Sequence, residues 1–308
     1  MNLITSRRSM LQAALGVLAS GGLLRNAPAQ SVHDKSTQTN RLGMFISLGA
    51  DPDKALKQVA DLGLTVAEVY SEDLDAEMGK KLEDAKAKHQ IDISALFTMG
   101  PGPQGWNHKD GPPTNGLVPR QWRRQRVDRL KEASDFCKQH GIPAVETHIG
   151  FVPEDPNDPL YGETVVALRE AAEHCKQNGQ RLLYHAGGET AVTMLRTLID
   201  VGVDSQGIGL DTANPIMYGT GHPADVLEVY GQYLVQVNAK DALWPTGPIE
   251  LGKEVPIGEG KVDFPRVFKK LRELKYAGPI IIEREISGPQ QIADIKKAIG
   301  FLKELLSK

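Results

Sequence analysis

Several features are scarce in this sequence of 308 residues, and each scarcity excludes a class of protein. Its two cysteines, Cys137 and Cys175, are too few for a disulfide framework, and on predicted helices we expect them to be small buried residues rather than a bridge. The formal net charge of −3 leaves no excess of Lys and Arg for a nucleic-acid backbone, so no nucleic-acid partner is expected. No GxGxxG follows the first predicted strand, which disfavours a dinucleotide-binding sheet.

The beginning of the chain has the features of an export signal. Arg7 and Arg8 precede the apolar segment 10–24, and Ala-Pro-Ala at 27–29 offers a small-residue cleavage site. We therefore predict a twin-arginine signal peptide over residues 1–29, its cleavage, and a periplasmic location. The alternative is an uncleaved anchor, but an apolar segment of about 15 residues is shorter than the ~20 needed to span a bilayer. We expect no stable membrane association after cleavage.

The remaining chain is mildly acidic. Loss of residues 1–29 removes three arginines and no acidic residue, which changes the formal charge from −3 to −6. The polar residues 30–41 are predicted to form a flexible segment ahead of one folded domain, 42–308. The densest basic run, RQWRRQR at 120–126, falls on a predicted helix and is interpreted as a solvated outer face.

Short apolar runs alternate with amphipathic stretches along the folded domain. The predicted strands are 42–48, 65–70, 91–97, 143–149, 181–186, 207–211, 234–239 and 279–285. The predicted helices are 53–62, 75–89, 120–140, 161–178, 189–200, 222–231, 263–275 and 289–307. Strands that alternate with helices indicate a parallel sheet. Eight such units predict an α/β protein with a single closed (β/α)8 TIM barrel rather than an open sheet.

Two segments rich in Gly and Pro are too long to be simple connections. They are 98–119, which contains Trp106, and 242–262. Loops of this length in a compact domain are usually functional. Both follow predicted strands, so we expect them to form walls of a substrate pocket, with Trp106 in contact with the substrate.

Polar residues stand where the apolar strands end. They are Glu146, His148, His185, Asp211, Asn238, Lys240, Glu283 and Glu285. Because side chains alternate between the two faces of a strand, the pairs 146 and 148, 238 and 240, and 283 and 285 each share a face. In a parallel barrel the carboxyl ends of the strands form the active-site face. The pattern therefore predicts an enzyme site at that end of the barrel.

Four of these residues could hold a divalent metal such as Mn, Zn, Co or Mg. His185, Asp211, Asn238 and Glu283 offer imidazole, carboxylate and amide-oxygen ligands. The alternative is that each is a separate buried polar group satisfied by hydrogen bonds, with no metal. A metal, or the ammonium group of Lys240, would offset the cost of burying the carboxylates.

With these residues in place, the chain resembles the xylose-isomerase-like TIM barrels over residues 42–307, and most closely the exported sugar phosphate isomerase/epimerase-type proteins. The resemblance depends on the segments THIGF, LDTAN, NAKD, VPIGEGKVDF and IEREISG. It implies a metal held by Glu, Asp, His and Glu after the fifth to eighth strands. Asp211 and Glu283 match this pattern, whereas His185 stands at the expected Glu and Asn238 at the expected His.

The resemblance implies a sugar or keto-sugar isomerase or epimerase that moves a proton at the carbon alpha to a carbonyl. Glu283, His185 and Lys240 are the candidate catalytic residues, with His185 replacing the usual second Glu. The candidate substrate-binding residues are His148, Glu146, Asn214, Glu285 and Trp106, and Glu68 is expected to support the site from behind. The expected partner is a small sugar, and assembly into a homo-oligomer stays open.

Two other functions are compatible with the sequence. One is a metal-dependent hydrolase or lyase acting on a glycoside-type substrate, because one fold hosts many chemistries. The other is a carbohydrate-binding barrel that has lost catalysis, which the exchanges at His185 and Asn238 motivate. An endonuclease of the same superfamily would need a His-rich metal cluster and a basic groove, neither of which the sequence predicts.

Overall fold

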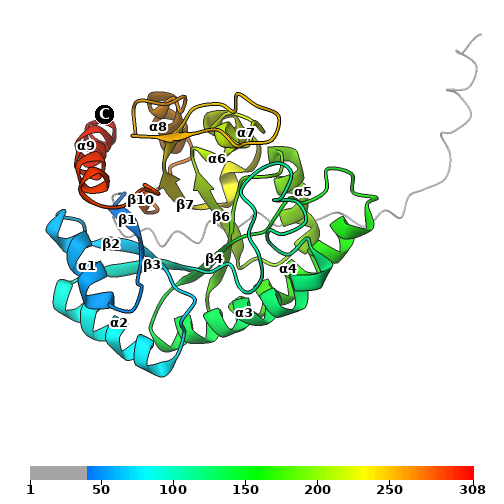
Figure 1. Cartoon of the computed structure of the whole chain (residues 1–308), viewed down its shortest axis with the longest axis horizontal. Coiled ribbons are helices and arrows are strands. Elements are labelled where there is room, and N and C mark those ends of the chain that lie inside the picture. Colours follow the sequence, from blue (N-terminus) through cyan, green and yellow to red (C-terminus); the bar gives the residue numbers. More distant parts are fainter. Residues whose placement is uncertain (1–39) are drawn as a thin grey trace, which may run out of the picture. The chain divides into compact units, whose positions relative to one another are not determined.

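A computed structural model of the chain describes residues 40–308. The predicted signal peptide and most of the predicted flexible segment lie outside the described residues. The eight barrel strands are parallel and close in the order β1-β10-β7-β6-β5-β4-β3-β2 (Figure 1). They are β1 (Leu42–Ser47), β2 (Val66–Tyr70), β3 (Asp92–Phe97), β4 (Ala144–His148), β5 (Arg181–His185), β6 (Gln206–Asp211), β7 (Leu234–Ala239) and β10 (Ile280–Ile282). The predicted (β/α)8 barrel is confirmed.

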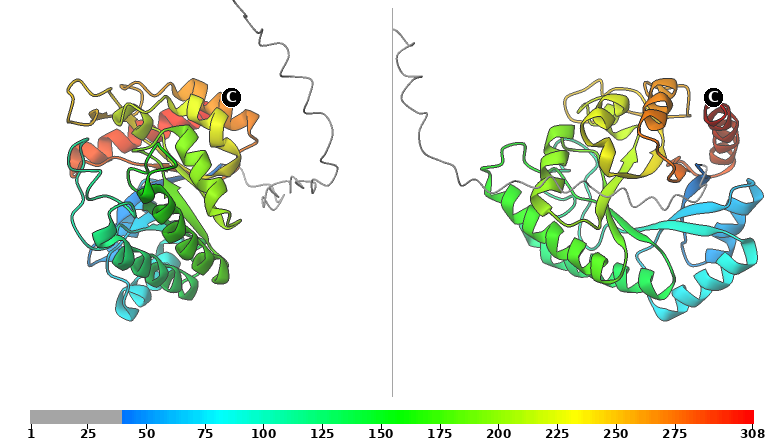
Figure 2. Two further views of the ribbon diagram at one scale, coloured as in Figure 1. Left: turned by 90° about the vertical axis from the view of Figure 1, so that its right-hand side faces the viewer. Right: turned by 180° about the vertical axis from the view of Figure 1, so that it is seen from behind.

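Helices connect the strands and lie outside them (Figure 2). They are α1 (Pro52–Asp61), α2 (Ala76–His89), α3 (Arg120–Gln139), α4 (Pro159–Gln177), α5 (Ala191–Val201), α7 (Pro223–Tyr230), α8 (Phe264–Glu273) and α9 (Pro289–Leu306). Four short elements were not predicted: the helix α6 (Asn214–Met217), the 3-10 helix η1 (Gly231–Tyr233), and the strands β8 (Asp241–Ala242) and β9 (Glu254–Val255). None of the helices between residues 40 and 308 combines the length and apolar character required to cross a membrane.

The eighth barrel strand is shorter than predicted. It ends at Ile282 instead of continuing to residue 285, so Glu283 and Glu285 stand on the segment that leaves the barrel. The backbone N–H of Glu283 still donates to the carbonyl of Ala239 at 3.0 Å. This bond keeps Glu283 at the mouth of the barrel, beside the end of β7.

Local signals explain where the helices begin and end. Asp51 caps α1 by accepting a hydrogen bond from the Lys54 N–H at 3.1 Å, and Pro52 occupies the first turn, where no N–H is required. After this helix, Gly63 has a φ of 70°, a conformation that favours glycine. The helices then bury apolar stripes such as Leu56 and Val59 against the strands, and each buried side chain contributes about 1.5–3 kcal/mol.

The predicted helix cysteines lie in this packed layer. Cys137 on α3 and Cys175 on α4 are both fully buried, and both are free thiols. Neighbouring helices α3 and α4 pack side by side in Figure 1. The cysteines therefore pack as small apolar side chains between the helices and the sheet.

The long loop 98–119 is organised by one buried cation. Arg126 on α3 is 1% exposed and donates four hydrogen bonds to backbone carbonyls of the loop. The acceptors belong to Pro101, Pro103, Thr114 and Gly116, at 2.9, 3.0, 2.6 and 2.7 Å. The interpretation of residues 120–126 as a solvated face is therefore wrong for Arg126, because the loop folds over this side chain and removes it from water.

The second long loop, 242–262, is organised by one buried anion. Asp241, the first residue of β8, is 1% exposed and accepts hydrogen bonds from four backbone N–H groups. The donors belong to Ala242, Gly258, Gly260 and Val262, at 2.9, 2.9, 3.0 and 3.0 Å. The two long loops meet where the His108 N–H donates to the Ile249 carbonyl at 2.8 Å.

Candidate functional site

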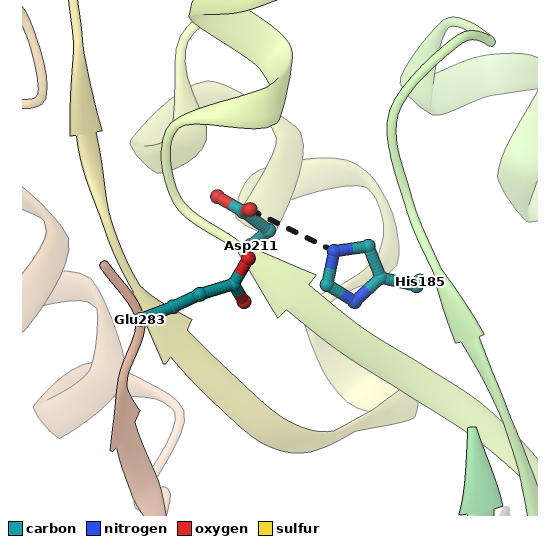
Figure 3. Close-up of side chains that lie close together, drawn as sticks. All are labelled: His185, Asp211 and Glu283. Atoms are coloured by element: carbon teal, nitrogen blue, oxygen red, sulfur yellow. Dashed lines mark ion pairs between the residues drawn. The ribbon is translucent and has the colours of Figure 1, made fainter. Parts of the chain in front are cut away.

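Three of the four predicted metal ligands meet at the mouth of the barrel. His185 is the last residue of β5, Asp211 is the last residue of β6, and Glu283 directly follows β10 (Figure 3). One ligand atom from each lies within 4.8 Å of the others, and all three side chains are buried. Parallel strands end on one face of a barrel, which is why residues far apart in the sequence meet here.

His185 is held in place by a carboxylate behind it. Its Nδ1 lies 2.8 Å from Glu146 Oε1, so this nitrogen carries the proton and Nε2 is left facing the cluster. Nε2 lies 3.6 Å from Asp211 Oδ2, an oxygen that is buried and makes no hydrogen bond. Burial alone would lower the pKa of His185, but Asp211 and Glu146 outweigh it and raise that pKa well above its usual value.

Glu146 therefore lies behind the site and not on the pocket wall. It is fully buried, and its second oxygen accepts a hydrogen bond from Gln236 Nε2 at 3.0 Å. The space that it fills exists because position 209 is glycine, since a Cβ there would lie 2.0 Å from Glu146 Oε1. The sequence predicts that Glu146 contacts the substrate. The structure instead has it orient the His185 ring.

Lys240 brings a positive charge into the same cluster. Its Nζ lies 3.2 Å from Asp211 Oδ2 and 3.0 Å from Glu283 Oε1, and it also contacts the Glu285 carboxylate. Burial would lower the pKa of Lys240, but these carboxylates outweigh it and raise that pKa well above its usual value. Burial would raise the pKa of Asp211, whereas Lys240 and His185 lower it to about 2. Lys240 and Asp211 therefore both remain charged.

Asn238 does not offer a free ligand atom. Its Nδ2 donates to Glu68 Oε2 at 2.6 Å and to Glu283 Oε2 at 3.1 Å, while its Oδ1 faces Gln236 Nε2 at 3.3 Å. Turning the amide would place its oxygen against two carboxylates. In this arrangement Asn238 connects Glu68 to Glu283, and its role as a metal ligand stays a prediction. Burial and the neighbouring Glu146 raise the pKa of Glu68 well above its usual value.

The cluster opens into a pocket of about 1020 Å³. The predicted substrate-binding residues His148, Asn214, Glu285 and Trp106 all line it. His148 lies between two rings, with centroids 4.4 Å from His185 and 5.1 Å from Trp106. Burial lowers the pKa of His148 well below its usual value, so its ring is neutral near pH 7. Asn214 also has a structural role, since its Nδ2 donates to the Ala186 carbonyl at 3.0 Å.

Both long loops reach the pocket, although unequally. Loop 98–119 contributes six lining residues between Met99 and Trp106, and loop 242–262 contributes Leu251. Several lining residues were not predicted, among them Phe45, Tyr70, Phe97, Gln104, Arg129 and Tyr218. Tyr70 and Phe97 are the last residues of β2 and β3, the same position as His148 and His185 on their strands. A search for aromatic as well as polar residues at strand ends would have found them.

The chain belongs to the xylose isomerase-like TIM barrel family, whose model matches residues 56–305. A solved xylose isomerase domain protein from Planctomyces limnophilus is 30% identical. The similarity covers 88% of this chain and 98% of that one, with a TM-score of 0.76. A comparison with curated proteins found no match.

More distant solved structures share the fold. A D-psicose 3-epimerase from Clostridium cellulolyticum H10, solved with D-tagatose, is 14% identical over 86% of this chain and 99% of its own, with a TM-score of 0.66. A xylose isomerase-like TIM barrel protein from Mycobacterium smegmatis, in complex with magnesium, is 18% identical over 82% and 87%, with a TM-score of 0.63. At these identities the similarity shows the fold alone.

The three-residue cluster fits a divalent metal. Asp211 Oδ2 is a buried oxygen that accepts no hydrogen bond; it faces His185 Nε2 at 3.6 Å and lies 3.2 Å from Lys240 Nζ. A buried carboxylate requires positive charge beside it. Lys240 and a protonated His185 supply that charge here, and a divalent metal would supply it once the imidazole has lost its Nε2 proton. The hydrogen bond from His185 Nδ1 to Glu146 is also the arrangement typical of metal-binding histidines. One imidazole and two carboxylates suit Mn, Zn, Co or Mg.

Proposed function

We propose that the protein is an isomerase or epimerase of a sugar or keto-sugar, which moves a proton at the carbon alpha to a carbonyl. The observation that carries the proposal is the meeting of Asp211, Glu283, His185 and Lys240 around one point in a pocket. Membership of the xylose isomerase-like family supports the same reaction class.

A divalent metal would be held by His185, Asp211 and Glu283, where it would supply a Lewis acid for substrate oxygens. His185 was predicted both as a ligand and as a proton-transfer group. Its Nδ1 is engaged with Glu146, so a single ring nitrogen, Nε2, is free for either role. We assign that nitrogen to the metal.

Glu283 is the group that moves the proton. Burial raises the pKa of its carboxyl group above the usual value, although Lys240 opposes the rise, and a carboxylate with a raised pKa is a better base near neutral pH. Its Oε1 lies 3.0 Å from Lys240 Nζ and its Oε2 accepts from Asn238, so the orientation of the carboxylate is fixed. Lys240 remains an ammonium group and stabilises negative charge that develops on the substrate.

The test is proton exchange with solvent. D-fructose, D-tagatose and D-psicose are incubated with the purified protein in D₂O, and deuterium uptake beside the carbonyl is followed by NMR. We expect uptake with at least one sugar, and Glu283→Gln should reduce it by roughly 10²–10⁴-fold. Glu259→Gln, at an exposed loop position, is the matched control and should exchange like the parent protein. Equal exchange by Glu283→Gln would overturn the assignment.

Metal binding is tested separately from activity. Elemental analysis of the purified protein should find a stoichiometric divalent metal, and Asp211→Asn should lose it. Asp225→Asn, at an exposed position, should retain it. Metal-free parent protein, prepared with an ample metal supply, would contradict the three-ligand site.

A carbohydrate-binding barrel without catalysis is the second candidate, and the position of Asn238 favours it. Asn238 ties Glu283 to the buried Glu68, which restrains the carboxylate that would have to move a proton. This function predicts sugar binding without deuterium uptake. The exchanges His185→Glu and Asn238→His, combined with Glu146→Gln to remove the carboxylate that faces position 185, should then raise the metal content and reveal turnover.

A further inference from the structure

The pocket is larger than one sugar ring requires. Its volume of about 1020 Å³ lies at the upper end of the ~300–1,000 Å³ found for pockets that enclose drug-sized ligands. The inner part, around His185, Lys240 and Glu283, is where the proposed chemistry takes place. The pocket continues beyond it to an outer part, lined by Gly100, Gln104, Trp106, Gln125 and Arg129. The proposed reaction leaves this outer part unexplained.

Gln104 points to a polar ligand in the outer part. Both atoms of its side-chain amide, Oε1 and Nε2, are buried and have no hydrogen-bond partner in the part of the chain that the structure describes. Leaving such groups unsatisfied is costly. The loop is fixed on either side of it, because Arg126 holds the carbonyls of Pro101 and Pro103, and the Gly105 N–H donates to Asn115 Oδ1 at 2.8 Å. An amide offers an acceptor and two donors, a set that matches adjacent hydroxyl groups of a sugar.

Trp106 lies where the inner and outer parts meet. Its ring centroid is 5.1 Å from that of His148, and the His148 centroid is 4.4 Å from that of His185. The Trp106 side chain is 47% exposed, although it is a large apolar group. A flat, exposed indole beside a polar site offers an apolar face and an N–H donor, which suits the C–H face of a sugar ring.

The paired charges of the pocket disfavour a phosphorylated ligand in its outer part. Within residues 40–308, the Lys and Arg side chains that line it are Lys240 and Arg129. Lys240 is paired with three carboxylates, and Arg129 is paired with Glu72 and Glu132. Carboxylates already neutralise both cations, so neither is available to bind a phosphate group. Five carboxylates line the same pocket: Glu72, Asp128, Glu132, Glu283 and Glu285.

The loops that usually bind phosphate in this fold are also poorly suited to a phosphate group here. TIM barrels often bind phosphate at the loops after the seventh and eighth strands. In this loop region Arg284 pairs with Glu254 at 2.8 Å and with Asp294 at 2.9 Å, whereas Lys253 and Lys261 are exposed and do not line the pocket. A dianionic group would meet net negative charge at both positions.

We propose that the outer part is a subsite for the second ring of a neutral disaccharide or other glycoside, whose reacting ring occupies the inner part. The identity of the reacting ring rests on the proposed function, whereas the subsite itself rests on the cavity, Gln104, Trp106 and the pairing of the cations. Gln104 binds hydroxyl groups of the second ring, and Trp106 stacks against one of its faces. The paired cations make the pocket select against sugar phosphates.

Binding is measured by calorimetry on the full-length protein. The probes are cellobiose, maltose, lactose and sucrose, their component monosaccharides glucose, galactose and fructose, and glucose 6-phosphate. We expect at least one disaccharide to bind about tenfold or more tightly than either of its monosaccharides, and glucose 6-phosphate to bind more weakly than glucose. The proposal is overturned if monosaccharides bind as tightly as every disaccharide, if the phosphate binds more tightly than glucose, or if none of the disaccharides binds.

Two variants assign the subsite to its residues. Gln104→Ala and Trp106→Ala should each reduce the ratio of disaccharide to monosaccharide affinity by about tenfold. Trp244→Ala is the matched control, because Trp244 is 41% exposed on the other long loop and does not line the pocket. It should leave the ratio unchanged. Circular dichroism confirms that each variant is folded, and an unchanged ratio in both folded pocket variants removes the subsite.

Failure of the subsite and failure of the proposed reaction give different results. If the reaction is wrong, no sugar takes up deuterium, yet the preference for disaccharides remains and still responds to Gln104→Ala. If the subsite is wrong, deuterium uptake by monosaccharides depends on Glu283 as before, and the disaccharide preference is absent.

Discussion

The two long loops over the barrel mouth are built in opposite ways. Loop 98–119 surrounds the cation Arg126, whose guanidinium group donates to four backbone carbonyls. Loop 242–262 surrounds the anion Asp241, whose carboxylate accepts from four backbone N–H groups. In each loop a single buried side chain provides four hydrogen bonds to backbone groups that no helix or sheet pairs.

The sign of the charge depends on which backbone groups point inward. A buried carbonyl needs a donor, and a guanidinium group supplies five N–H donors in a rigid arrangement. A buried N–H needs an acceptor, and a carboxylate supplies two oxygens with several lone pairs. One buried charge can therefore shape an irregular segment, provided that the backbone turns groups of one kind toward it. Four variants test this comparison.

Removal of the cation should have the largest effect. Arg126→Ala leaves four loop carbonyls without their donor, and we expect a loss of about 4 kcal/mol in the free energy of unfolding. Urea denaturation measures the loss. Arg124→Ala, an exposed ion-paired arginine on the same helix, is the control and should change stability by less than about 1 kcal/mol. Equal losses in the two variants would show that Arg126 does not organise the loop.

Glu189 is a buried carboxylate with fewer hydrogen-bond donors than Asp241. Its contribution to stability should therefore depend on pH. Glu189 accepts from a single N–H of another residue, that of Gly187 at 3.2 Å, and burial raises its pKa to about 7. Because this pKa is raised above that of the unfolded chain, stability is fully present below about pH 4.5 and falls as the pH rises to 7. Relative to the parent protein, Glu189→Gln should gain up to about 3 kcal/mol between pH 4 and pH 8.

The measurement for Glu189 is urea denaturation of both proteins at several pH values. The difference between them cancels the titration of other groups. Glu259→Gln, at an exposed position, should show no such gain. A pH-independent difference between the parent and Glu189→Gln would mean that Glu189 remains charged in the folded protein.

Replacing the Asp241 carboxylate should lower the free energy of unfolding by a smaller amount. Burial raises the pKa of Asp241 above its usual value, but the four N–H donors oppose that rise and stabilise the charge. Asp241→Asn replaces one acceptor oxygen with a donor that faces backbone N–H groups, and we expect a loss of about 2 kcal/mol. Hydrogen exchange should quicken between residues 256 and 262 and remain unchanged between 98 and 119. Faster exchange in both loops would mean that one charge holds them together.

The contact between the loops should have the smallest effect. His108→Pro removes the N–H that donates to Ile249, at a cost of about 1 kcal/mol. His108→Ala retains the N–H and is the control. We expect hydrogen exchange to become faster in both loops of His108→Pro and to stay unchanged in His108→Ala. Unchanged exchange would show that the two loops are independent.

The sequence predicted the fold closely because its signals are local. Asp51, Pro52 and Gly63 bound α1 through the geometry of a few adjacent residues, so the predicted and observed helices differ by one residue at each end. The alternation of strands and helices then leaves few ways to close a parallel sheet. The eighth strand was predicted too long because the apolar run PIII passes into EREIS without a turn residue to end it.

The site was harder to predict in detail because its contacts are not local. Strand ends and side-chain parity brought His185, Asp211 and Glu283 into one candidate group, and the structure places them together. The role of Asn238 depends on Glu68, a residue 170 positions away in the sequence. The burial of Arg126 likewise depends on the path of a loop that has no periodic pattern. Contacts between side chains that are far apart in the sequence can be identified only from the three-dimensional structure.

The close fit between Glu146 and His185 has an evolutionary consequence. A glutamate at position 185, which the family resemblance led us to expect, would meet the buried Glu146 carboxylate where the imidazole now makes a 2.8 Å contact. Because position 209 is glycine, the Glu146 carboxylate has space at this place and is not displaced from it. The two positions are therefore epistatic: His185→Glu alone should be poorly tolerated, and a compensating Glu146→Gln should rescue it. A mutational route between a histidine and a glutamate at position 185 should therefore change Glu146 first or at the same time.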